Sequence, residues 1–72
     1  MPRWNLGVQE LTDRDRRILE LASYGKTNKE IAEALNVSPA TPLKDLSEIY
    51  YLLGAKNRAH AVAIALRGGI IQ

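Results

Sequence analysis

The chain has 72 residues, of which ten are Lys or Arg, eight are Asp or Glu and none is Cys, and its formal charge is +2. A chain of this length forms one domain at most, and the absence of Cys excludes a disulfide framework and a thiolate zinc site, so we expect neither a metal nor a cofactor. The longest apolar run, residues 61–66, is far shorter than the about 20 residues of a membrane span, and the first residues lack a signal-peptide core. We therefore expect a cytoplasmic protein that does not enter a membrane.

The first ten residues predict an N-terminal tail. Residues 1–10 contain one proline and one glycine and show no sustained hydrophobic period. We expect Trp4 or Leu6 to pack against the body of the protein, which is predicted to be a single domain over residues 11–72.

The first helix is predicted to begin after Thr12, whose hydroxyl can accept a hydrogen bond from the backbone N–H of Asp15. Asp13 and Asp15 are well placed for the positive end of the helix dipole. We expect Gly25 to end this helix. Its buried face is predicted to carry Ile18, Leu21 and Ala22.

A short second helix is predicted from a capping box. Thr27 and Glu30 have the spacing at which each side chain satisfies the other residue's free backbone N–H. Asn36 is expected to end the helix in a left-handed conformation. The buried stripe should consist of Ile31, Ala34 and Leu35.

The start of the third helix is set by two prolines. Ser38 and Pro39 would ordinarily open a helix, but Pro42 would then clash with the carbonyl of Ser38. Because a proline inside a helix costs about 3 kcal/mol, we predict that the helix begins later, with Thr41 as cap and Pro42 as the first helical residue. The backbone before Pro42 should then be non-helical, and Gly54 should end the element. The inward stripe is predicted to be Leu46, Ile49, Tyr50 and Leu53, and the outward arc Leu43, Lys44, Ser47, Glu48 and Tyr51.

A fourth helix is expected from Asn57, as its cap, to about Arg67, where two glycines follow. This helix is apolar on two faces, and such a helix in so small a protein needs two neighbours. We expect one neighbour to be a second copy of the chain, in a homodimer formed through Ala61, Ile64 and Ala65. The alternative is that the N-terminal tail covers this face.

The sequence gives little support to an enzyme. His60 falls in the first turn of an apolar helix, where a solvated residue is expected rather than a ligand or a base. The acidic pairs in the chain are better explained as charges at a helix start or on a surface. We therefore predict that the chain is not an enzyme.

Three stretches of the chain, LTDRDRR, GKTNKEIA and LGAKNRAHAV, carry a resemblance to a known family. The sequence resembles the LuxR/GerE-type helix-turn-helix family from Leu11 to about Ile70 without a gap. This resemblance implies an all-α fold, a four-helix DNA-binding domain. Such domains occur as output modules of larger regulators or alone in small GerE-like proteins, and they commonly dimerise through the last helix.

The resemblance also implies a set of residues that hold the phosphate backbone of double-stranded DNA. Lys and Arg side chains and helix N-termini favour anions, and such contacts position a protein without reading base sequence. The matching positions in this chain are Lys29, Thr41, Lys56, Asn57 and Arg58.

The departures from the family pattern lie in the third helix, around residues 42–53, which would read the major groove. The family usually has Val, Lys and, two residues after that Lys, His at the positions of Pro42, Leu43 and Asp45. Glu48 would be repelled by phosphates, as would Asp45, unless each accepted a hydrogen bond from a cytosine amino group. Polar or basic residues are also usual in the family at Glu48, Tyr51 and Leu52.

Two functions are therefore expected. In the first, the domain is a sequence-specific transcription regulator in which Lys44 and Ser47 contact bases and Leu43 contacts a thymine methyl group. In the alternative, a degenerate helix-turn-helix binds or dimerises with proteins and binds DNA weakly or not at all. A protein partner would then contact an apolar patch made of Leu43, Tyr51 and Leu52.

Overall fold

A computed structural model describes residues 10–72 of the chain, and these residues form helices and no strands. The helices are α2 (Asp13–Ser23), α3 (Asn28–Leu35), α4 (Ala40–Leu53) and α5 (Arg58–Arg67). The all-α helix-turn-helix fold predicted from the sequence is therefore confirmed. The predicted packing of Trp4 and Leu6 lies outside the described residues. No helix within residues 10–72 has the length and apolar content needed to cross a membrane.

The predicted N-terminal caps of the first two helices are present. The Thr12 hydroxyl accepts from the Asp15 backbone N–H at 3.0 Å, and the Thr12 N–H donates to the Asp15 carboxylate at 3.1 Å. Thr27 and Glu30 make the same reciprocal pair at 3.1 and 2.9 Å. Each box gives a hydrogen-bond partner to two backbone N–H groups from residues only three positions apart. These helix starts could therefore be predicted from spacing alone. Residues with positive φ follow the helices where expected, at Gly25, Asn36 and Gly54.

The start of α4 corrects the prediction from its prolines. Pro39 already has helical angles, φ −57° and ψ −23°, and α4 begins at Ala40, so Pro42 is not the first helical residue. The Ser38 carbonyl accepts from the N–H of Thr41 at 2.9 Å, and the Ser38 hydroxyl accepts from the N–H of Ala40 at 3.2 Å. The carbonyl that Pro42 cannot bond thus has a partner one residue earlier, in a tightened first turn. The Pro42 ring is also fully buried, and this packing offsets the lost hydrogen bond.

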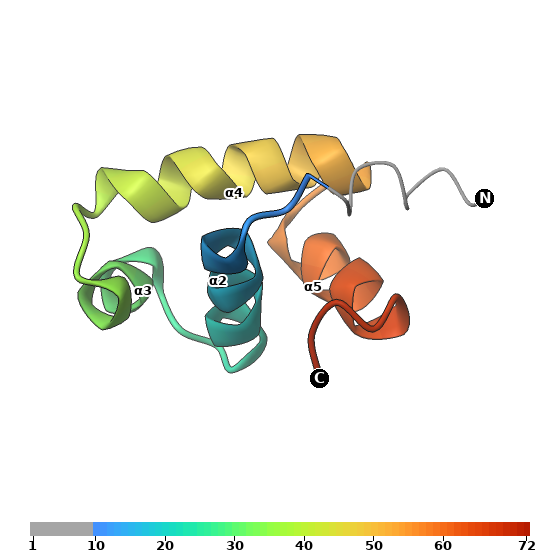
Figure 1. Cartoon of the computed structure of the whole chain (residues 1–72), viewed down its shortest axis with the longest axis horizontal. Helices are drawn as coiled ribbons and strands as arrows, with labels where there is room; N and C mark the ends of the chain where they lie inside the picture. The colour runs from blue at the N-terminus through green and yellow to red at the C-terminus, as the bar shows by residue number, and fades with distance from the viewer. Residues whose placement is uncertain (1–9) are drawn as a thin grey trace.

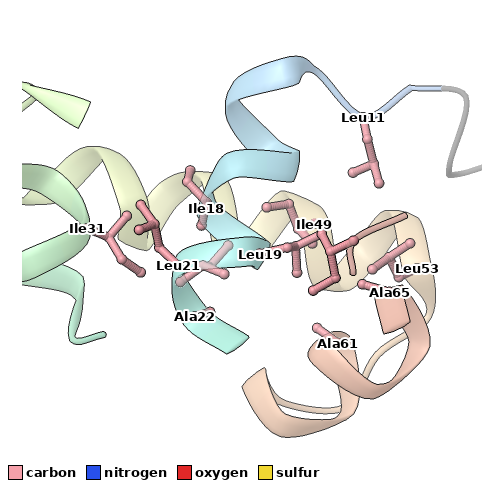
Figure 2. Close-up of a cluster of buried hydrophobic side chains, with 12 residues drawn as sticks. Leu11, Ile18, Leu19, Leu21, Ala22, Ile31, Ile49, Leu53, Ala61 and Ala65 are labelled. Atoms are coloured by element: carbon pink, nitrogen blue, oxygen red, sulfur yellow. The ribbon is translucent and has the colours of Figure 1, made fainter. Parts of the chain in front are cut away.

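The four helices are arranged so that α4 lies along the long axis of the molecule, with α3, α2 and α5 packed beneath it (Figure 1). Apolar side chains from all four helices meet in one core (Figure 2). The fully buried members of this core are Ile18, Leu19, Ile31, Ile49, Ala61 and Ala65. Because one side of α4 is fixed on this core, its opposite side faces solvent along its whole length.

Candidate nucleic-acid interface

The outward arc of α4 is exposed as the sequence predicted. Leu43 is 61% and Tyr51 86% exposed, and the neighbouring polar side chains of the arc are exposed as well. Leu46, Ile49 and Leu53 lie on the opposite side, in the core. A helix that keeps one face on a core and presents polar side chains on the other has the geometry needed to enter a major groove. The polar members of this exposed face are Lys44, Ser47 and Glu48.

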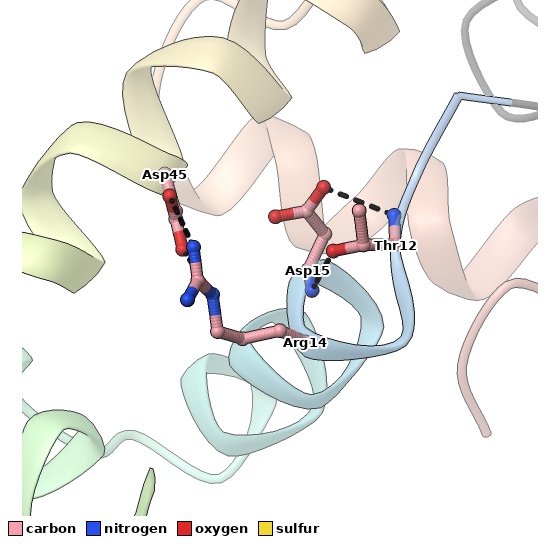
Figure 3. A network of polar contacts seen from close by, with 4 residues as sticks. All are labelled: Thr12, Arg14, Asp15 and Asp45. Carbon is pink, nitrogen blue, oxygen red and sulfur yellow. Dashed lines mark hydrogen bonds and ion pairs between the residues drawn. The ribbon is translucent and has the colours of Figure 1, made fainter. Parts of the chain in front are cut away.

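Asp45 does not lie on the exposed face of α4, which corrects the expectation that it would repel phosphates. Its side chain is 6% exposed and pairs with Arg14 of α2, with 2.8 Å between Arg14 Nε and Asp45 Oδ2 (Figure 3). Arg14 Nη2 also donates to Asp45 Oδ1 at 3.3 Å. The acidic charge at this position is thus directed inward and compensated by a cation, while Glu48 remains exposed on α4.

A second cluster of site residues forms where the Arg58 side chain, at the start of α5, reaches the start of α3, and we name it the α3–α5 junction. Arg58 joins the two helices, because its Nη1 donates to Asn28 Oδ1 at 2.7 Å and its Nη2 donates to the carbonyl of Lys26. The predicted phosphate residues Lys29 and Lys56 flank these groups in sequence, and both are exposed. Sequence reasoning missed Lys26 and Asn28, because their partner is about thirty positions away and no local pattern reveals the pairing.

Asn57 and His60 shape the turn that carries Lys56. The Asn57 side chain accepts from the backbone N–H of His60 at 2.8 Å, which confirms the predicted cap of α5. His60 in turn accepts at Nδ1 from the backbone N–H of Lys56 at 3.0 Å. The histidine, expected to be merely solvated, therefore holds the backbone of a predicted phosphate residue in place. Thr41, also predicted to contact phosphate, is half-buried in the first turn of α4.

Glu30 contributes to the electrostatics at the start of α3. Its carboxylate accepts from the backbone N–H of Thr27, and this bond, with a smaller contribution from the Thr27 hydroxyl, lowers the pKa of Glu30 below its ordinary value. Lys26 lowers the pKa further. The charge of Glu30 is therefore used within the capping box, beside the basic residues of the α3–α5 junction.

A shallow groove of about 440 Å³ runs between the start of α2 and the second half of α4. Carboxylates dominate its polar lining, so this edge of the exposed α4 face is acidic. The lining residues are Glu10, Thr12, Asp15, Ser47, Glu48, Tyr51 and Leu52. The second half of the exposed α4 face is thus bounded by an acidic groove.

Two assignments of apolar surface residues are corrected by burial. Ala61 and Ala65 have zero exposure and belong to the core of their own protomer, so they are not on the surface of α5. Ile64 is half-buried against the same core. Leu52 is likewise half-buried and packs on the core, which leaves only Leu43 and Tyr51 exposed in the predicted apolar patch. The outward side of α5 instead presents Ala59, Ala63 and Leu66.

Comparison with known proteins places this geometry in a family. Residues 9–65 match the GerE family, described as bacterial regulatory proteins of the luxR family. Over 62 residues the chain is 44% identical to the transcriptional activator protein BjaR1 of Bradyrhizobium diazoefficiens, an alignment that covers 86% of the chain and 26% of BjaR1. It is 46% identical over 61 residues to the uncharacterized transcriptional regulatory protein YvfU of Bacillus subtilis, covering 85% of the chain and 30% of YvfU.

A third relative has nearly the same length as the chain. Over 62 residues the chain is 40% identical to the spore germination protein GerE of Bacillus subtilis, covering 86% of the chain and 84% of GerE. The chain therefore spans most of GerE but less than a third of BjaR1 and YvfU. The prediction of a LuxR/GerE-type regulatory domain is confirmed: the chain belongs to the luxR family of bacterial regulatory proteins.

Proposed function

We propose that this domain regulates transcription by binding duplex DNA, with the exposed face of α4 in the major groove and the α3–α5 junction on the phosphate backbone. The observation that carries the proposal is the exposed arc of α4, whose polar side chains project from a helix fixed on the core by its other face. A regulator must reach its DNA, so we place it in the cytoplasm of a bacterium.

The phosphate contacts are proposed for the basic residues around the junction. Lys29 and Lys56 are exposed near the N-termini of α3 and α5, where backbone N–H groups and the helix dipoles also favour anions. Arg58 adds positive charge while its guanidinium is bonded to neutral acceptors. Asn57 and Thr41 are proposed to complete this set.

The base contacts are proposed for the first half of α4. Lys44 can donate to guanine, Ser47 can donate or accept, and Leu43 can pack on a thymine methyl group. The burial of Asp45 supports this assignment, because a paired and inward-facing carboxylate places little negative charge in the groove.

We also propose that the domain forms a homodimer through the outward side of α5. Ala59, Ala63 and Leu66 form a stripe of small and apolar side chains there, and Leu66 is 48% exposed. The variant Leu66→Glu is expected to shift a dimer to monomer in sedimentation velocity, with unchanged helix content by circular dichroism. Lys44→Glu, on α4, is the control and should leave the dimer intact. A parent chain that sediments as a monomer at high concentration would contradict this assembly.

The exposed Leu43 and Tyr51 side chains favour a second candidate function, a protein-binding module. Salt dependence separates the two functions. Each phosphate contact contributes about −0.9 to the slope of log affinity against log salt, so several contacts require affinity to fall steeply as salt rises. A protein-binding module would bind duplex DNA weakly even at low salt.

The deciding experiment is fluorescence anisotropy with a random duplex pool at low and moderate salt. We expect steep salt dependence for the parent chain, and a slope shallower by about one unit for Lys56→Ala, because one phosphate contact is lost. Arg67→Ala, which removes the same charge from an exposed position in the last turn of α5, is the control. Weak binding at low salt, with no effect of Lys56→Ala, would favour the protein-binding alternative.

A further inference from the structure

We propose that Arg14 is an additional phosphate-binding residue of this domain and that Asp45 is the residue that positions it. The inference rests on the proposed DNA-binding function and adds a contact on the α2 side of α4. Neither residue belongs to the phosphate set that the family resemblance implies. The ion pair between them comes from this chain's own replacement of the usual His by Asp45.

Asp45 orients the guanidinium of Arg14. Arg14 turns its Nε edge toward Asp45, with Nε 2.8 Å from Oδ2 and Nη2 donating to Oδ1 at 3.3 Å. One hydrogen bond and a close ion pair to the same carboxylate restrict the orientation of the guanidinium, while Asp45 Oδ2 itself accepts no hydrogen bond within residues 10–72. A group that is already restricted loses less entropy when it binds a second ligand. Asp45 is able to act as this support because it is itself held, 6% exposed, against the core side of α4.

Part of the Arg14 guanidinium remains available to a second ligand. The Arg14 side chain is 52% exposed, and no partner other than Asp45 is found for it within residues 10–72. Its Nη1 group and the remaining Nη2 hydrogen therefore lie on the solvent side of the pair. A planar group with free N–H donors in a fixed orientation matches the geometry of phosphate oxygens.

Arg14 lies on the α2 side of α4. Arg14 extends from the first turn of α2 to α4 at Asp45, which lies one residue from Lys44 and two from Ser47 (Figure 3). Arg14 thus lies alongside the half of α4 that carries the proposed base-reading residues, on the flank of the helix that faces α2. Lys29 on α3 and Arg14 on α2 would then contact phosphates from two different helices.

The test uses two matched pairs of variants in duplex anisotropy titrations. Arg14→Ala is expected to weaken binding about tenfold, the loss of one charge-assisted hydrogen bond. Affinity should also become less sensitive to salt. Between about 50 and about 200 mM salt, the factor by which affinity falls should be about threefold smaller than for the parent, which is the contribution of one phosphate contact. Arg16→Ala removes the same charge from nearly the opposite side of α2 and should change binding far less.

The second pair separates positioning from simple charge. If Asp45 only repelled DNA, Asp45→Asn would strengthen binding, as Glu48→Gln should. If Asp45 holds Arg14 in place, Asp45→Asn weakens binding, and this weakening disappears when Arg14 is already Ala. Opposite signs for Asp45→Asn and Glu48→Gln support the proposal, whereas strengthening by both overturns it.

A direct readout on the parent chain does not depend on whether the variants fold. The Nε–H resonance of Arg14 should shift when duplex is added, together with amide resonances of α4. If the parent binds duplex with steep salt dependence but Arg14→Ala behaves like Arg16→Ala and this resonance stays unmoved, only the present inference fails. A parent chain without salt-dependent duplex binding overturns the proposed function as well.

Discussion

Two arginines tie distant parts of this domain together, and they do so with different partners. Arg14 on α2 bonds a carboxylate on α4, Asp45, across 31 positions in the chain. Arg58 on α5 bonds an amide oxygen and a backbone carbonyl, those of Asn28 and Lys26, across a similar separation. The first arginine has its charge compensated by its partner, whereas the second keeps its charge because both of its acceptors are neutral.

The difference shows how a small domain can fix the orientation of a basic side chain and still keep its net positive charge. Neutral acceptors fix the Arg58 guanidinium and leave the junction, with Lys29 and Lys56, strongly basic. A buried carboxylate makes a stronger individual bond but removes net charge from its surroundings. The two arginines should therefore differ in how their removal affects folding and in how it affects binding of a polyanion.

The largest expected effect on stability comes from breaking the Arg14 pair from the arginine side. Arg14→Ala leaves the Asp45 carboxylate buried without its cation, and we expect a loss of about 3 kcal/mol in the free energy of unfolding. Asp45→Asn should cost only about 1 kcal/mol, because the half-exposed Arg14 can return to solvent. Urea denaturation at neutral pH measures both values. Equal losses in the free energy of unfolding for the two variants would contradict the idea that an unpaired Asp45 carboxylate costs more than an unpaired Arg14.

A smaller effect on stability is expected at the junction. Arg58→Ala removes two hydrogen bonds whose acceptors are neutral and partly solvated, and should cost about 2 kcal/mol. Asn28→Ala removes one of these bonds and keeps the cation, so it should cost about 1 kcal/mol. The matched readout is the salt slope of duplex binding, which should become shallower for Arg58→Ala and stay near the parent value for Asn28→Ala. A shallower slope for both would mean that orientation, and not charge, limits binding at the junction.

The smallest effect concerns pH at the start of α3. Hydrogen bonds from Thr27 lower the pKa of Glu30 in the folded state, so the carboxylate stabilises the fold at pH values above its unfolded pKa. This contribution is lost as pH falls through the lower, folded pKa, in the acidic range. Glu30→Gln keeps a capping side chain without this charge, so the parent should melt at a higher temperature near neutral pH, and the two melting temperatures should converge as pH falls through that range. Parallel melting curves at all pH values would contradict this role for Glu30.

The local features of the fold were predicted from sequence because each depends on residues only a few positions apart. Both capping boxes, the Asn57 cap and the left-handed Asn36 involve contacts within one helical turn. The exposed arc of α4 also followed from its hydrophobic period. Two local predictions were wrong. The start of α4 was misplaced because the cost assigned to Pro42 did not include a tightened first turn or the burial of its ring. Ala34, predicted in the buried stripe of α3, is exposed, and Ala32 is buried instead.

The tertiary structure decided which surfaces these helices leave free. Asp45 lies at the edge between the buried and exposed sides of α4, where the helical period alone does not fix its direction, and only the approach of Arg14 settles it. Ala61 and Ala65 fit the pattern of an exposed apolar face as well as that of a core, and packing against the other helices places them in the core. Sequence by itself thus determined the helices and their ends, since those interactions are local. The partners of Arg14 and Arg58 depended on the assembled fold, because about thirty residues separate each of them from the groups that they bind.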